Sequence, residues 1–253
     1  MSEVLERRFA EMGARLSLAE WPWHGSPRID VRGSRFDVTF VGEGPRAEVE
    51  VIDVDARDHH LLLLVRNRGD KSKFLCGHDE RHWFVAAVPE AARGVTGVTS
   101  AKAALQPEPV QLAAKRLKDP FRRRNAAYVR QGEWFFVPVP DVRVDAFRVS
   151  HNEPLTRGRG NAHVLQHAYR TGGTPVYANW RNPAGISEER FARLSADERK
   201  RGNWTRFMRD PELYAKGTVR HPDHATVVLP RWHRVLMNTE QRARAMQHVV
   251  FLD

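Results

Sequence analysis

The spacing of apolar residues predicts one helix at the start of the chain, followed by a series of strands. In residues 2–18, apolar side chains such as Leu5, Phe9 and Met12 recur three or four positions apart, which is the period of one face of a helix. Over residues 28–66, apolar and polar residues alternate in short runs, which is typical of strands with one buried face. We therefore expect a helix and then an antiparallel meander of three or four strands joined by short turns.

The rest of the chain carries shorter helical and β patterns. A strand pair over 73–89 and a strand over 132–140 continue the β pattern, and Pro107 separates two short helices, since proline ends one helix and can begin the next. The sequence also predicts helices over 99–105, 108–118, 162–170, 187–194 and 196–209, and strands over 174–180, 217–221, 225–230, 231–238 and 247–253.

Together, these elements predict an α+β protein. Its N-terminal part is an antiparallel β meander with short helices, and its C-terminal part is mixed α/β and ends in one or more β-hairpins. We divide the chain into a β-rich N-terminal domain over 1–95 and a basic α+β domain over 107–253. A single domain is the alternative, because 253 residues fit either one large or two small domains and no low-complexity linker marks the boundary.

Three features of the sequence predict a cytoplasmic protein without a membrane partner. No window holds the roughly 18 uncharged apolar residues that a membrane-spanning helix needs. The first residues mix both charges and do not resemble a secretory signal. The single cysteine, Cys76, cannot form a disulfide within the chain, which fits a reducing compartment.

Positive charge is concentrated in the C-terminal part. The chain has 41 Lys and Arg against 31 Asp and Glu, a formal net charge of +10, and residues 107–253 hold 26 of the basic and 15 of the acidic residues. Such an asymmetry indicates a polyanionic partner. Nucleic acid is the leading hypothesis, and an acidic protein in a larger assembly is the alternative.

The basic residues fall into three groups close to aromatic or glycine residues. Basic side chains neutralise phosphates, and aromatic rings stack on unpaired bases, so RNA or a single strand is favoured over a duplex. The predicted nucleic-acid contacts are Lys115, Arg116, Arg122, Arg123, Arg124, Tyr128 and Arg130 in the first group, Arg157 and Arg159 in a glycine-rich segment, and Arg201, Trp204 and Arg206 in the third.

A histidine-rich segment near the end of the chain is the first candidate for chemistry. It contains His221, Asp223, His224 and His233. If 225–230 and 231–238 pair as a hairpin, His233 returns toward His224. Imidazole and carboxylate groups bind divalent metals such as zinc and act as acids and bases near neutral pH. The alternative function of the protein is therefore a metal- or histidine-dependent hydrolase or nuclease acting on phosphate esters. The simpler interpretation of the segment is a polar turn without a role in chemistry.

A second cluster combines a thiol with two imidazoles. Cys76, His78 and His82 lie within seven residues, a spacing that would suit a tight zinc site with a fourth ligand from elsewhere. Cys76 beside a histidine base would also suit a nucleophile, although a lone cysteine after two apolar residues is more often buried. The sequence contains no P-loop, dinucleotide-binding, zinc-deaminase or serine-hydrolase motif.

Overall fold

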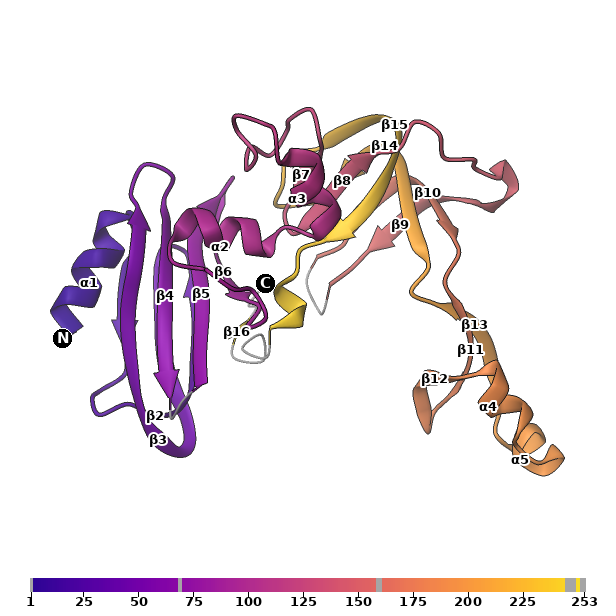
Figure 1. Cartoon of the computed structure of the whole chain (residues 1–253), viewed down its shortest axis with the longest axis horizontal. Coiled ribbons are helices and arrows are strands. Elements are labelled where there is room, and N and C mark those ends of the chain that lie inside the picture. Colours follow the sequence, from indigo (N-terminus) through magenta and orange to yellow (C-terminus); the bar gives the residue numbers. More distant parts are fainter. Residues whose placement is uncertain (1, 68–69, 158–160, 244–248, 251–253) are drawn as a thin grey trace.

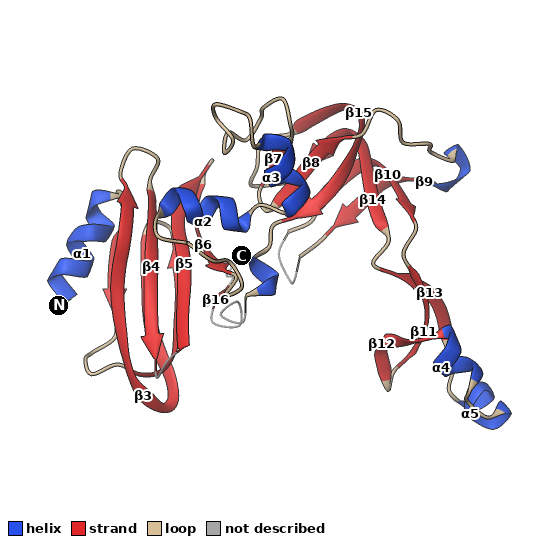
Figure 2. Ribbon diagram, in the orientation of Figure 1, coloured by secondary structure: helices blue, strands red, loops and turns tan. Residues whose placement is uncertain are grey.

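A computed structural model describes residues 2–67, 70–157, 161–243 and 249–250. Of the residues that the structure describes, 51% lie in strands and 17% in helices, so this part of the chain is mostly β. The strands form two large sheets and one small sheet, and the helices are short (Figure 2). The α+β expectation therefore holds only in part, because strands dominate both halves of the chain.

The first sheet is built around one long central strand. Its 21-residue β3 pairs with β2 through its first half and with β4 through its second half. The strand order is β16-β2-β3-β4-β5-β6, with β1 parallel beside β3. The strands are β1 Arg15–Leu18, β2 His24–Arg32, β3 Arg35–Asp55, β4 His60–Asn67, β5 Asp70–Asp79, β6 His82–Val88 and β16 Val249–Val250.

Helices cover both faces of this sheet (Figure 1). On one face, α1 Ser2–Glu11 buries Leu5 and Phe9 in the larger core cluster, and on the other α2 Val98–Leu105 packs in a second cluster. Along β4, Leu61 and Leu63 belong to the first cluster and Leu62 to the second. A strand covered on both faces needs apolar residues at every position, which explains the continuous aliphatic run of β4.

The second sheet follows the first along the chain and has its own core. Its strand order is β7-β8-β15-β14-β10-β9, and its core includes Phe136, Leu165 and Leu229. A small further cluster joins α3 Glu108–Ala114 to the sheet. The strands are β7 Val129–Gln131, β8 Trp134–Pro138, β9 Val149–Leu155, β10 His163–Thr171, β14 Glu212–Arg220 and β15 Val227–Met237, with 3-10 helices at η1 Ala146–Arg148 and η2 Glu240–Arg242.

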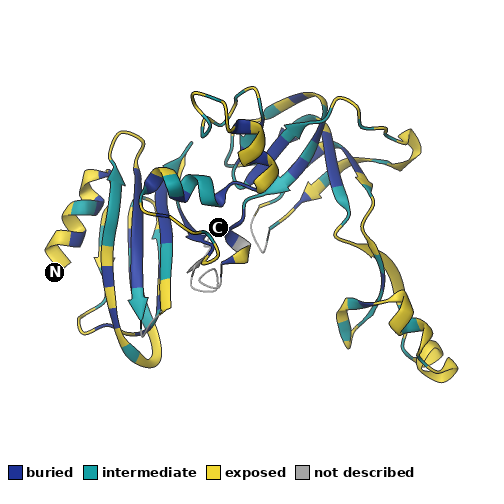
Figure 3. Cartoon of the chain, in the orientation of Figure 1, coloured by how far each residue is buried: buried dark blue, intermediate teal, exposed yellow. Residues whose placement is uncertain are grey.

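A separate arm, residues 174–209, is inserted between β10 and β14. It projects from the end of the second sheet, away from the first (Figure 1), and most of it is exposed (Figure 3). Its three strands are ordered β12-β11-β13. The arm comprises β11 Thr174–Asn179, β12 Asn182–Ser187, α4 Glu188–Ala192, α5 Ala196–Arg201 and β13 Thr205–Arg209.

Several predicted elements are confirmed. The meander over 28–66 is present as β2, β3 and β4, and the strand pair over 73–89 as β5 and β6. Both helices around Pro107 are present, although α3 ends at Ala114. The division into 1–95 and 107–253 stays a prediction, and β16 of the second range pairs with β2 of the first sheet.

Three predicted elements are wrong. The helix over 162–170 is strand β10, the end of the helix over 196–209 is strand β13, and the hairpin of 225–230 with 231–238 is one continuous strand, β15. Pro230 fits inside β15 because pairing with β8 begins only at His233, so no ladder on that side requires its missing N–H. The helix over 2–18 also ends early, and residues 15–18 form β1.

No helix in the described ranges has the length and apolar character needed to cross a membrane.

Candidate functional site

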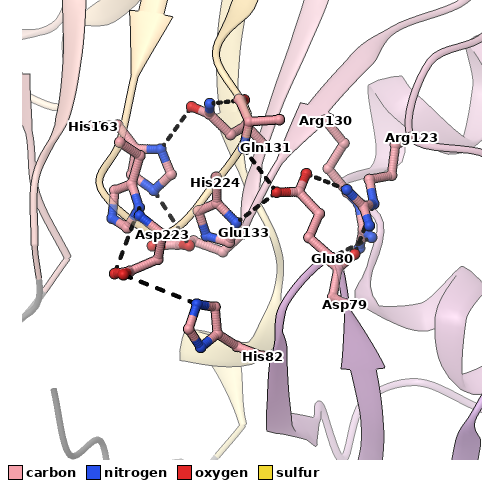
Figure 4. A network of polar contacts seen from close by, with 12 residues as sticks. Asp79, Glu80, His82, Arg123, Arg130, Gln131, Glu133, His163, Asp223 and His224 are labelled. Atoms are coloured by element: carbon pink, nitrogen blue, oxygen red, sulfur yellow. Dashed lines mark hydrogen bonds and ion pairs between the residues drawn. The ribbon is translucent and has the colours of Figure 1, made fainter.

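Three histidines meet at one end of the second sheet. His163 begins β10, His221 directly follows β14, and His224 lies in the loop before β15. One ring nitrogen of each lies within 4.8 Å of those of the other two, and no other group of three metal-binding side chains occurs in the described part of the chain. We call these three residues the histidine centre; Figure 4 shows it with its polar neighbours.

Strand pairing explains why residues so distant in sequence meet. β10 and β14 are antiparallel, and Val164 lies opposite Arg220. The start of β10 and the end of β14 therefore share one end of the sheet, which brings His163 beside His221. The chain then turns, and the backbone N–H of Asp223 donates to Nδ1 of His221 at 3.1 Å. This turn carries His224 back to the other two rings, with ring centroids 5.6 Å and 4.7 Å away.

A buried glutamine fixes the orientation of His163. The side-chain amide of Gln131 donates to the carbonyls of Val219 and Ala225, so its oxygen is the acceptor that faces Nδ1 of His163 at 3.0 Å. His163 must then carry its proton on Nδ1 and keep a lone pair on Nε2. That tautomer presents Nε2 as a metal ligand.

A carboxylate from the first sheet orients His224 in the same way. Glu80, in the turn between β5 and β6, lies 3.2 Å from Nδ1 of His224 and accepts from the backbone N–H of Ala225 at 3.0 Å. Its side chain and that of His224 are 12% and 15% exposed, so the contact is largely shielded from water. Carboxylate–histidine pairs of this kind leave the other ring nitrogen available and increase its basicity.

One arginine pairs directly with this carboxylate, and a second arginine is linked to it through Asp79. Arg123 pairs with Glu80 and, at 2.7 Å, with Asp79, while Arg130 pairs with Asp79 at 2.8 Å. The four side chains connect the β5–β6 turn to the segment before β8 (Figure 4). The three histidines belong to the second sheet and the loops at its end. The first sheet contributes Glu80 and Asp79 to their surroundings.

The Nε2 atoms of His163 and His224 face the same small space. A methyl group placed on Gly132, in the turn between β7 and β8, would lie 3.0 Å from Nε2 of His224 and 3.5 Å from Nε2 of His163. Gly132 has a φ of +57°, a left-handed conformation that favours glycine. Glycine therefore suits this turn and also leaves the space beside both nitrogens open.

The third imidazole is held differently. Nδ1 of His221 accepts from the Asp223 backbone, and its Nε2–H donates to the carbonyl of Asn161 at 3.2 Å. Both nitrogens are thus engaged, so His221 must release one of these contacts to bind a metal. Burial, and then the nearby His163 and His224, lower the pKa of His221, which keeps the ring in the neutral form that ligates metals.

Glu133 is the acidic group nearest the free ring nitrogen of His163. Its carboxylate oxygen lies 3.8 Å from Nε2 of His163. Burial opposes ionisation of Glu133, but the His163 ring when it is protonated, hydrogen bonding to the backbone and the charge of Arg157 lower the pKa of Glu133 below the ordinary value. Glu133 is therefore a carboxylate at neutral pH, available as a ligand or as a base. Behind it, buried Glu240 pairs with Arg157.

The donor set fits a zinc-type ion. Zinc binds imidazole nitrogen at about 2.0–2.1 Å, and catalytic zinc sites commonly use three protein ligands and keep one open position, so tetrahedral ligand atoms lie about 3.4 Å apart. The ligand atoms lie within 4.8 Å of one another, so each pair must close by about 1.4 Å at most to reach that spacing. Two of them already present free Nε2 atoms, and a carboxylate stands beside one.

The structure brings together only part of the histidine segment that the sequence singled out. His221 and His224 belong to the centre, and Asp223 is partly exposed, 3.9 Å from Nε2 of His82. His233 lies in the middle of β15, where its Nδ1–H donates to the carbonyl of Arg231 at 2.7 Å. Because β15 is one strand, His233 is about 20 Å from its start, and it does not reach the centre.

The second predicted cluster is dispersed. Cys76 is fully buried in the core of the first sheet, where burial raises the pKa of its thiol. His78 packs against Trp83, with ring centroids 5.0 Å apart. His82 instead faces Asp223. Cys76 and His78 share one face of β5, but Cys76 is enclosed in the core, His78 packs on Trp83, and His82 lies beyond the turn. Among the described residues the three do not form a group that could hold a metal.

The predicted nucleic-acid contacts also have different environments. Lys115, Arg116, Arg122 and Arg124 are exposed, whereas Arg123, Arg130 and Arg157 pair with the carboxylates described above. Tyr128 is 1% exposed, so its ring cannot stack on a base. Arg201, Trp204 and Arg206 belong to the arm, and Arg159 lies outside the described residues.

Sequence reasoning missed His163, Glu80, Gln131 and Glu133. Each lies far along the chain from the segment 221–224. The pairing of β10 with β14 positions His163, the β7–β8 hairpin beside β15 positions Gln131 and Glu133, and the contact between the sheets positions Glu80. No protein-family model, curated protein or solved structure matches the chain.

Proposed function

We propose that this protein is a metal-dependent hydrolase whose metal is held by His163, His221 and His224. The observation that carries the proposal is the convergence of three imidazoles within 4.8 Å, two of them oriented by Gln131 and Glu80 so that Nε2 faces inward. Rings fixed through Nδ1 so that Nε2 keeps a lone pair are the arrangement that metal-ligating histidines show.

The surroundings favour hydrolysis of an anionic ester. A zinc-type ion in such a site lowers the pKa of a bound water to about 7. Glu133, ionised and beside His163, is placed to accept the proton of that water. The positive charge of residues 107–253 attracts anionic substrates, so a phosphate ester or phosphodiester is the substrate class that we propose.

Metal analysis tests the ligand set. We expect the purified protein to hold about one equivalent of zinc or another transition metal, and His163→Ala and His224→Ala each to lose it. His151→Ala is the matched control, because His151 is an exposed histidine on strand β9 of the same sheet. Far-ultraviolet circular dichroism checks that each variant is folded. Metal content unchanged in both centre variants would refute the ligand assignment.

Activity is tested separately. Hydrolysis of bis(p-nitrophenyl) phosphate and p-nitrophenyl phosphate is measured for the metal-loaded protein, for protein treated with a chelator, and for Glu133→Gln. Loss of a general base typically reduces turnover by about 10²–10⁴-fold, and we expect Glu133→Gln to fall in this range while it retains metal. If the metal-loaded wild type hydrolyses neither ester, the proposal of a hydrolase acting on these esters is refuted and only the proposal of a metal-binding protein stands.

A further inference from the structure

The arm, residues 174–209, has little interior of its own. Only Val176 and Ile186 are buried within it, and all five residues of β13 are exposed. One face is covered by α4, where the ring of Phe191 stacks on Tyr177 at 3.7 Å. The arm is thus a thin projection whose surface greatly exceeds its core (Figure 3), which is a form suited to contacting another molecule.

Large apolar side chains on the arm face solvent. Trp180, at the turn between β11 and β12, is 77% exposed, Met208 is 43% exposed and Phe207 is 38% exposed. The guanidinium of Arg181 lies 4.6 Å from the centre of the Trp180 ring. An aromatic ring that is exposed on a projecting element is accessible for stacking on an unpaired base, and an arginine beside it can contact the adjoining phosphate.

The arm is also basic. It contains eight Lys and Arg against four Asp and Glu. Arg206 pairs with Glu188 at 3.0 Å, but Arg181, Arg190 and Arg193 contact no carboxylate among the residues that the structure describes. These arginines remain available for an anion, and their charge is not neutralised by the arm itself.

The arm lies at the opposite end of β10 and β14 from the histidine centre. Both strands have nine residues, so the two sites are on the order of 25–30 Å apart at about 3.3 Å per residue. Binding at the arm is therefore separable from metal binding, and the inference below does not depend on the proposed hydrolase activity.

We propose that the arm binds single-stranded nucleic acid, with Trp180 stacking on a base and Arg181, Arg190 and Arg193 contacting phosphates. Charge complementarity and exposed aromatic rings occur together here, which is the combination that unpaired nucleic acid requires. An acidic protein would complement the charge, whereas an unpaired nucleic acid complements both the charge and the exposed face of the Trp180 ring. A duplex is disfavoured because its bases are paired and stacked on one another, so none is open to the Trp180 ring.

Fluorescence anisotropy with labelled (dT)20 and (rU)20 tests the proposal on the full chain. We expect micromolar binding at low salt, with preference for one probe identifying DNA or RNA. Trp180→Ala should weaken binding about tenfold, in line with the loss of one stacked base. Replacing Arg181, Arg190 and Arg193 by glutamine should lower the slope of log affinity against log salt by about 2, at about 0.7 per phosphate.

The arm can also be removed without cutting the second sheet. Thr171 and Glu212 are direct antiparallel partners, so residues 172–211 can be replaced by Asn-Gly, which closes a two-residue β-hairpin. This variant should lose at least tenfold in affinity for the oligonucleotides and keep the metal content of the wild type. Far-ultraviolet circular dichroism and a cooperative urea transition show that the second sheet is folded, whether or not metal is bound.

Two control variants match the removed groups. Phe147→Ala removes a fully exposed aromatic ring outside the arm, and Arg28, Arg57 and Arg93→Gln remove three exposed arginines of the first half of the chain. Both should bind as the wild type does. Three results would each overturn the proposal. The controls could weaken binding as much as the arm variants do, binding could be lost only on changing Lys115, Arg116 and Arg122, or the wild type could bind no oligonucleotide.

Discussion

His60 shows how a single buried side chain makes stability depend on pH. It begins β4, is 9% exposed, and packs against Gly77 and the ring of Phe84. Burial, and then the charge of Lys102, lower its pKa to about 4, against about 6.5 in an unfolded chain. Between these values the unfolded state binds the proton and the folded state does not, so stability is complete above pH 6.5 and decreases as the pH falls toward 4.

We expect His60 alone to reduce the free energy of unfolding by about 2–3 kcal/mol between pH 7 and pH 4.5, since one pKa unit corresponds to about 1.4 kcal/mol. Urea unfolding of the wild type and of His60→Asn at both pH values measures this, because asparagine can keep the hydrogen bond to the carbonyl of Asp58 without titrating. The difference between the two proteins isolates His60 from other histidines. If the free energy of unfolding changed equally with pH in both proteins, His60 would not be the source of the pH dependence.

At the scale of residues, the sequence predicted two of the three histidines of the centre. His221 and His224 are recognisable because they lie three positions apart with a turn between them. His163 is not, since nothing local distinguishes it from His151 or His167. The role of Cys76 was also ambiguous from the sequence. The residues beside it suit either a buried thiol or a metal-binding thiol, and only further ligands close in space would tell the two apart.

Helix α2 illustrates how one element depends on another. The backbone N–H of Val98, at the start of α2, donates to a carboxylate oxygen of Asp53 on β3 at 2.8 Å. Gly97 is close to the same oxygen, which a methyl group there would approach to 2.7 Å. Asp53 therefore supplies from a strand the acceptor that a helix normally receives from its own N-cap residue.

Asp53→Ala should reduce the free energy of unfolding by about 1–2 kcal/mol, the usual cost of removing a helix cap. Glu50→Ala is the control on the same strand, because Glu50 is exposed and, within the described ranges, forms an ion pair with the half-exposed Arg66. Surface pairs contribute about 0–1 kcal/mol. Chemical denaturation of both variants at pH 7 makes the comparison. Equal losses in the two would show that Asp53 does not cap α2.

Elements were predicted best where their period is regular. The meander alternates cleanly, and its strands were found. β10 was taken for a helix because a register shift between Leu165 and His167 interrupts the two-residue period, so that its apolar residues follow no single face. β13 was taken for a helix end because all its residues are exposed, and an exposed strand has no alternation to recognise. Whether β15 can continue through Pro230 depends on whether a neighbouring strand needs a hydrogen-bond donor at that position. Only the strand pairing shows this.

At the scale of the whole molecule, the contact between the sheets controls the histidine centre. Glu80 belongs to the first sheet and orients His224 of the second. Glu80→Gln keeps an acceptor for Nδ1 but removes its charge, and we expect a 10–100-fold loss of zinc affinity, as for other groups that orient metal ligands. Competition with a chromogenic chelator measures the affinity.

Asp79→Asn is the matched control for this variant. Asp79 is adjacent in sequence and pairs with the same Arg123, but it makes no hydrogen bond to His224 among the described contacts. Its zinc affinity should stay within a few-fold of the wild type. If Asp79→Asn weakened zinc binding as much as Glu80→Gln, the general charge of the turn, and not the bond to His224, would set the affinity.

The pairing of β16 with β2 bears on the order of events during protein synthesis. All other strands of the first sheet are complete by residue 88, so most of that sheet can assemble while the ribosome is still adding the second one. The edge of β2 stays open until residues 249–250 emerge, and an open strand edge invites pairing with other chains. Ribosomes that stall within the second sheet would therefore release chains with a nearly finished but unsealed first sheet, which are the products most prone to aggregate.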